Sequence, residues 1–131
     1  MPQFDPAIPI YRQIMDEISG QIISGKLKAG GQLPSVRELA QTFQVNPNTI
    51  ARAYRELERE GIVFTRRGQG TFVSEEEGIF VTLKRERAEA IIASFFREMS
   101  SLGFSRQESL AWAQESINRG GDKNGARIGR Q

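Results

Sequence analysis

The chain has 131 residues, a hydrophobic content of 38% and a formal net charge of +2, which fits one compact domain with a small appendage. It contains neither cysteine nor histidine. This composition excludes disulfides, thiolate or imidazole metal ligands, and the Ser-His-Asp and Cys-His arrangements of nucleophilic catalysis. No apolar run approaches the roughly 18 residues of a membrane span, and no secretory signal is visible. We therefore expect a cytoplasmic protein that is not an enzyme and uses neither metal nor cofactor.

The N-terminal region predicts an extended lead-in followed by one amphipathic helix. Three prolines among the first nine residues disfavour a helix there. From Ile10 the isoleucines recur at helical spacing, and Gly25 can cap the helix end, so we predict a helix over 10–24. The glycine-rich segment 27–33 is expected to be a plain connection.

Two short capped helices are predicted next. Ser35 and Glu38 have the spacing of a capping box, which indicates a helix over 36–43. Asn46, followed by a proline, is typical of the start of a further helix, over 47–60. The connection between them has room only for a tight turn. The pair therefore predicts a helix-turn-helix, which places its second helix in the DNA major groove.

A hairpin is predicted directly after these helices. Residues 62–65 and 71–74 are rich in β-forming side chains, and the segment between them carries two arginines and two glycines. After a helix-turn-helix, a hairpin with a basic tip is typical of the wing of a winged helix. The acidic residues 75–77 then indicate a boundary, which assigns 1–75 to a winged-helix domain. The predicted fold class is mainly α with one small β-hairpin.

Beyond this boundary the apolar pattern predicts two more helices, over 76–118. Gly103 ends the first, and Ser105 with Glu108 forms a second capping box. An isolated helix pair would leave a large apolar patch exposed, so we expect a twofold interface between two copies of the chain. The alternative is that these helices fold back on the winged helix. The expected interface residues are Leu83, Ile91, Ile92, Phe95, Phe96, Met99, Leu102 and Trp112.

The C-terminal residues 119–131 are rich in glycine and polar side chains, which predicts a disordered tail.

Short polar side chains at the start of the third helix are the candidate groups for DNA contact. Asn48 and Thr49 can reach base edges or phosphates, whereas Asn46 can act as a helix cap, a DNA contact or both. Basic candidates are Arg37 and Arg52 on the helices and Arg66 and Arg67 on the hairpin. Two further arginines, Arg55 and Arg59, lie among glutamates and are expected to form surface salt bridges.

Three segments, Leu33 to Ala40, Val45 to Gly61 and Gly68 to Val73, resemble the winged-helix domain of the GntR family of bacterial transcription regulators. The resemblance covers about residues 8–74. It implies a dimeric repressor that binds a palindromic operator in double-stranded DNA. Matched to the family pattern, the DNA contacts fall on Ser35, Arg37, Asn46, Asn48, Thr49, Gly68, Gln69, Gly70 and Thr71.

The sequence of the third helix resembles that of the short YtrA-type subfamily, and this resemblance implies control of a transporter operon. At Pro47 and Ala51, where many members of the family carry arginines that contact DNA, the chain departs from the pattern. The competing class is a winged-helix module that binds protein or RNA without recognising an operator. The polar start of the third helix, which shows no exposed apolar residue, favours DNA. The sequence indicates no particular effector.

Overall fold

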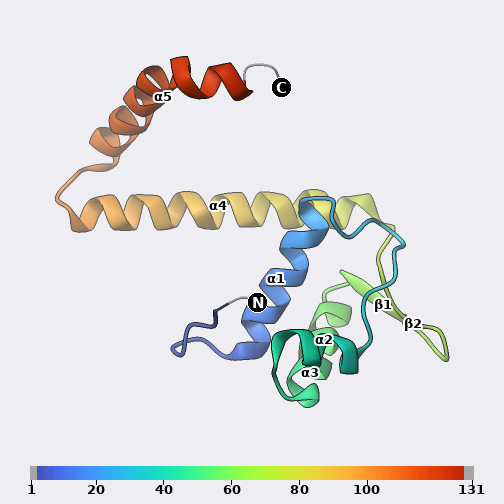
Figure 1. The fold of residues 1–131 in the computed structure, drawn as a ribbon. Coiled ribbons are helices and arrows are strands. Elements are labelled where there is room, and N and C mark those ends of the chain that lie inside the picture. Colours follow the sequence, from blue (N-terminus) through green and yellow to red (C-terminus); the bar gives the residue numbers. More distant parts are fainter. Residues whose placement is uncertain (1–2, 129–131) are drawn as a thin grey trace. The chain divides into compact units, whose positions relative to one another are not determined.

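The computed structural model describes residues 3–128, and the side chains of residues 3–120 (Figure 1). The predicted fold class, mainly α with one antiparallel hairpin, is confirmed. None of the helices described is both long and apolar enough to cross a membrane. The chain divides into two compact units, after Arg85. The elements are α1 (Ile10–Ile23), α2 (Val36–Phe43), α3 (Pro47–Arg59), β1 (Val63–Arg66), β2 (Gly70–Val73), α4 (Glu77–Ser101) and α5 (Arg106–Ile128).

The first unit is built on a core that α1, α2, α3 and the hairpin share. Ile14, Ile18 and Ile22 lie four residues apart, so they share one face of α1, and this face packs against α3. Ile50 and Leu57 of α3 are completely buried in this core. The other buried apolar side chains are Leu33, Leu39, Ala40, Phe43, Ala53, Tyr54, Ile62, Val63 and Val73.

Side-chain caps start both helices of the helix-turn-helix. The Ser35 hydroxyl accepts a hydrogen bond from the backbone N–H of Glu38 at 3.1 Å, and the Glu38 carboxylate accepts one from the N–H of Ser35 at 2.9 Å. Asn46 Oδ1 accepts from the N–H of Asn48 at 2.7 Å. Gln44, at φ 57°, makes the left-handed turn between α2 and α3. The predicted capping box and tight turn are thereby confirmed.

A third backbone segment, which the sequence does not indicate, pairs with the hairpin. Strands β1 and β2 pair antiparallel, with Val63 opposite Val73. Residues 30–33, predicted as a plain connection, run along the outer edge of β2. The N–H of Leu33 donates to the Thr71 carbonyl at 2.8 Å, and the N–H of Val73 donates to the Gly31 carbonyl at 2.8 Å. The pairing is made by backbone hydrogen bonds. The segment has no alternating apolar pattern, so its sequence does not indicate a strand.

The first turns of α4 belong to the winged-helix unit. The helix begins at Glu77, inside the acidic run that predicted a boundary, because a carboxylate is stabilised in the first turn of a helix. Ile79, Phe80 and Leu83 pack against the winged-helix core. The compact units therefore divide after Arg85 rather than after residue 75. Leu83, expected at an interface between copies, is instead half-buried within its own chain.

The second unit contains the rest of α4 and α5. The predicted capping box is present: the Ser105 hydroxyl accepts from the N–H of Glu108 at 3.0 Å. The backbone is helical to Ile128, whereas disorder was expected from residue 119. Glycine costs a helix about 1 kcal/mol but retains its N–H, and no proline follows Pro47, so nothing in residues 119–128 blocks helix propagation. The predicted tail at 129–131 lies outside the described residues.

The packing of α4 on the core predicts that a truncated winged-helix unit needs the first turns of α4 for full stability. A chain that ends at Arg85 keeps Ile79, Phe80 and Leu83, whereas one that ends at Ser74 loses them. We expect the shorter chain to be less stable to unfolding by about 2–4 kcal/mol, because three half-buried apolar side chains no longer cover the core. Urea denaturation of both chains, followed by circular dichroism, measures the difference. Equal midpoints would show that the first turns of α4 add nothing to the core.

Candidate nucleic-acid interface

The first turn of α3 presents one exposed polar side chain that forms no hydrogen bond within the described residues. Asn48 is exposed, and within residues 3–120 its side chain makes no hydrogen bond. Asn46 differs, because its Oδ1 is already used as the helix cap. Thr49 is half-buried beside them. Of these candidates, Asn48 is therefore the one whose amide is completely free to reach a base edge.

Two arginines of the helix-turn-helix stay clear of the acidic residues near them. Arg37 is exposed and forms no ion pair in the described part of the chain, since Glu38 is engaged in the capping box. Arg55 likewise forms none. Of the two expected surface salt bridges, only that of Arg59 is present, with its Nη1 3.2 Å from an oxygen of Glu56. Arg37 and Arg55 are thus available to an external anion.

Arg52 is held by α1 instead of extending the polar turn of α3. Its guanidinium carbon lies 3.9 Å from the centre of the Tyr11 ring. This stacking fixes the side chain through a cation–π contact, while the N–H groups at the edge of the guanidinium remain free to donate. The sequence pattern did not reveal this, because Tyr11 and Arg52 are brought together only by the packing of α1 on α3.

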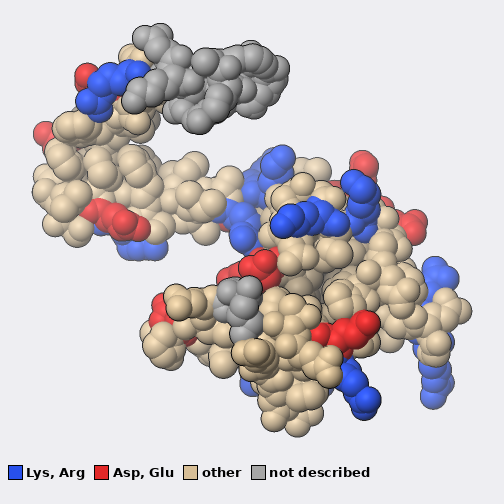
Figure 2. Space-filling view, viewed as in Figure 1, with Lys and Arg blue, Asp and Glu red and all other residues tan. Residues whose placement is uncertain are grey.

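The hairpin tip carries one restrained and one unrestrained arginine. Arg66 lies over Phe64 and Phe72, 5.4 and 5.9 Å from the two ring centres. Arg67 is exposed and contacts no ring or acid within the described residues. Figure 2 shows basic side chains at the outer end of the hairpin. Gly68, at φ 76°, makes the turn there.

Gln32 is a residue of this surface that sequence reasoning missed. Its Nε2 donates a hydrogen bond of 2.8 Å to the backbone carbonyl of Gln69 at the hairpin tip. A Cβ atom at Gly70 would lie 2.6 Å from the same nitrogen, so the contact requires glycine at φ 122°. Gln32 therefore ties the hairpin tip to the segment that leads into α2. No local pattern marks a glutamine whose partner lies 37 residues away.

A groove of about 970 Å³ lies between the start of α2 and the hairpin. Ser35, Gln69 and Thr71 are among its lining residues, so the cap of α2 and the hairpin contribute predicted contacts to the same groove. At its base the Tyr54 hydroxyl donates to the Pro34 carbonyl at 2.7 Å. Burial, with a contribution from the charge of Glu38, raises the pKa of Tyr54, so this donor stays protonated at neutral pH.

The geometry defines a class of protein. A helix-turn-helix presents the polar first turn of its second helix, and a hairpin with arginines at its tip is hydrogen-bonded to the segment that leads into the other helix. Within residues 3–120, no group of three or more acidic side chains is placed to hold a metal ion. This is a winged-helix DNA-binding fold.

Comparison with known proteins identifies the family. The sequence pattern of "Bacterial regulatory proteins, gntR family" matches residues 10–73. The chain is 46% identical to the HTH-type transcriptional regulator YhcF of Bacillus subtilis, over 82% of this chain and 89% of that protein. It is 39% identical to the HTH-type transcriptional repressor YtrA of B. subtilis, over 95% and 99%. The chain belongs to the GntR family, and it is a DNA-binding transcription regulator, not an enzyme.

Solved structures agree with this assignment. A GntR family transcriptional regulator from Listeria monocytogenes superposes with a TM-score of 0.77 at 41% identity, covering 86% of this chain and 98% of that one. The AraR DNA-binding domain, solved in complex with operator ORR3, gives a TM-score of 0.51 at 35% identity, over 56% and 87%. The resemblance to YtrA noted in the sequence is confirmed at the level of the whole chain.

The Gln32 contact predicts a variant that loosens the hairpin without unfolding the protein. Gln32→Met keeps the length of the side chain but removes the N–H donor to Gln69. We expect duplex DNA affinity to fall about three- to tenfold, the value of one hydrogen bond, because the hairpin tip is no longer held beside α2. Fluorescence anisotropy measures the affinity, and thermal unfolding checks the fold. The matched control is Gln21→Met on α1, and equal losses in both variants would contradict the assignment.

Proposed function

We propose that this chain is a homodimeric repressor that binds a palindromic operator in the cytoplasm. The observation that carries the dimer is the apolar surface of the second unit. Within this unit α4 has no buried residue, and several large apolar side chains of α4, α5 and the turn between them are about half exposed or more. They are Ile91 at 67%, Ile92 at 53%, Leu102 at 71%, Leu110 at 62%, Trp112 at 48% and Ile117 at 65% exposure.

A second copy of the chain is the partner that suits this surface. Exposed apolar patches of such breadth are rare on monomeric proteins and mark interaction sites. A twofold axis covers the same patch on both copies at once. Phe95, Phe96 and Met99 of α4 are half-buried, and we include them in the same apolar surface. Leu83 is left out, because it packs on the winged-helix core.

Two winged helices joined in this way would meet two half-sites of inverted sequence, since a protein with twofold symmetry matches DNA with twofold symmetry. We assign base contacts to Asn48 and Thr49, and phosphate contacts to Arg37 and Arg67. The hairpin backbone at 68–71 and the Ser35 hydroxyl would contact phosphates beside them. Arg52 and Arg66, which are stacked on aromatic rings, would donate from their free edges.

Repression is proposed because the relative that spans 95% of the chain is named a repressor, and because the AraR domain is solved on an operator. A repressor of this size would act by occupying its operator. Control of a transporter operon remains a prediction from the subfamily resemblance. The test is whether the operator selected by this chain from a random duplex library occurs upstream of transporter genes.

Asn48 offers the sharpest test of base recognition. Asn48→Ala should weaken binding to the selected operator by about 1–3 kcal/mol and leave binding to unrelated duplexes nearly unchanged, because a base contact is lost. Arg67→Ala is the control: it should weaken binding to every duplex and reduce the salt dependence by about one unit. A mismatch series in anisotropy titrations separates the two. If Asn48→Ala lowers affinity equally on all duplexes, Asn48 contacts the backbone.

The proposed interface predicts a variant that separates the copies. Ile91→Glu changes a side chain that is 67% exposed, so the protomer keeps its fold, but in a dimer the new carboxylate would be buried without a partner. We expect monomers in analytical ultracentrifugation. We also expect far weaker binding to a palindromic operator than the wild type shows, because the tethering of two half-sites is lost. The control is Ala90→Glu, on the opposite face of α4. A dimer that survives Ile91→Glu would place the interface elsewhere.

A further inference from the structure

A second hollow lies in the winged-helix unit, and Leu27 lines both this hollow and the groove beside the hairpin. It has a volume of about 340 Å³ and lies between the end of α1, the connection after it and the first turns of α4. Its walls are mainly apolar and include Ile22, Leu27, Phe80 and Val81. Lys28 and Lys84 complete the lining. Its size is at the lower end of the range for small-molecule sites, about 300–1,000 Å³.

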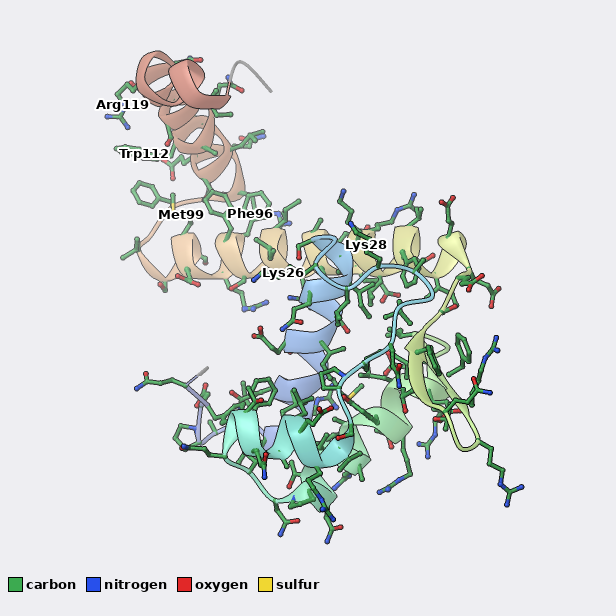
Figure 3. The ribbon with its side chains drawn as sticks, turned by 45° about the vertical axis from the view of Figure 1, so that its right-hand side comes forward. Lys26, Lys28, Phe96, Met99, Trp112 and Arg119 are labelled. Carbon is green, nitrogen blue, oxygen red and sulfur yellow. The ribbon has the colours of Figure 1, made fainter. Side chains whose placement is uncertain are left out.

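Three of the lysines lie on the hollow or on the segments that form it. Of the four lysines in the sequence, Lys26 and Lys28 follow α1, and Lys84 lies on α4. Figure 3 shows Lys26 and Lys28 at the C-terminal end of α1. None of the three forms an ion pair within residues 3–120, and Lys28 makes only a long hydrogen bond of 3.4 Å to the Gly25 carbonyl. The charges of Lys28 and Lys84, which line the hollow, are therefore available to a ligand.

The predicted DNA contacts include arginines but no lysine. Every basic residue between positions 35 and 73 is an arginine. Tyr11, in the first turn of α1, contacts Arg52 of α3, whereas the hollow borders Ile22 near the other end of α1. Eleven residues of helix separate these positions, about 16 Å at the helical rise. A small molecule bound here would not compete with DNA at α3.

We propose that this hollow binds a small amphiphilic anion, an apolar chain or ring that carries one carboxylate or phosphate. The apolar part packs against Ile22, Leu27 and Phe80, and the anionic group pairs with the ammonium groups of Lys28 and Lys84. Phe80, Val81 and Lys84 belong to α4, which continues into the second unit. The ligand therefore bridges the winged-helix core and the helix that carries the proposed interface.

Calorimetric titration of the full chain with butanoate, hexanoate and octanoate tests the apolar half of the proposal. Each added methylene should tighten binding by up to about fourfold until the hollow is filled. Octanol, which lacks the charge, should bind more weakly than octanoate. Octyl phosphate, compared with octanoate, distinguishes the two anionic groups, and both should bind more tightly than octanol. Affinity that does not change with chain length would overturn the proposal, and so would octanol that binds as tightly as octanoate.

Variants test the charged half. Lys28→Gln and Lys84→Gln should each weaken octanoate binding by about two- to fivefold, as expected for a partly exposed ion pair. Lys26→Gln is the matched control, since Lys26 does not line the hollow, and should have no effect. Val81→Glu puts a carboxylate at a wall position that is 60% exposed and should abolish binding without unfolding the chain. An equal effect of all three lysine changes would overturn the site. Failure of the wild type to bind octanoate, the result if a second copy covers the hollow, would do the same. None of these measurements depends on the operator.

Discussion

The pairing of residues 30–33 with β2 is the constraint on which the DNA-binding surface depends. The N–H of Leu33 and the carbonyl of Gly31 are hydrogen-bonded to β2, and Leu33 itself is buried in the core. The same short segment leads directly into the capping box of α2. Because backbone hydrogen bonds of a strand have defined length and direction, the hairpin and α2 are held in one orientation. Gln32 extends this connection to the hairpin tip.

The arginines of the DNA-binding unit fall into two groups that differ in freedom. Arg52 and Arg66 lie against aromatic rings, so part of the conformational entropy that a long side chain loses on binding is already lost. Arg37, Arg55 and Arg67 lie over no aromatic ring within residues 3–120. Stacked arginines suit contacts of fixed geometry, whereas free ones can follow the phosphate backbone of different duplexes. The surface thus combines a rigid and an adaptable electrostatic component.

Helix α4 has two different chemical roles along its length. Its first turns cover the winged-helix core through Ile79, Phe80 and Leu83, and they also form one wall of the lysine-flanked hollow. Beyond Arg85 several of its apolar side chains, including Ile91 and Ile92, are exposed within the described part of the chain. A single helix therefore links the unit that carries α3, the hollow and the exposed apolar surface. The ligand proposed for the hollow would contact the first turns of this same helix.

The sequence by itself determined the helix caps and the hairpin turn, which depend on neighbours along the chain. Each of these features involves residues within a few positions of one another: the capping boxes at Ser35 and Ser105, the cap at Asn46 and the hairpin tip. The order of the features that precede residue 75 carries the resemblance to the GntR family. Local hydrogen bonds and φ preferences leave such patterns few alternatives.

Only the tertiary structure decided what distant residues do. The pairing of 30–33 with β2, the bond from Gln32 to Gln69 and the stacking of Arg52 on Tyr11 join positions with no shared pattern. Leu83 shows the same limit, since helical spacing places it on an apolar stripe but does not say which surface covers it. Amphipathic spacing specifies a face that needs burial, whereas the partner of that face is set by packing across the whole fold.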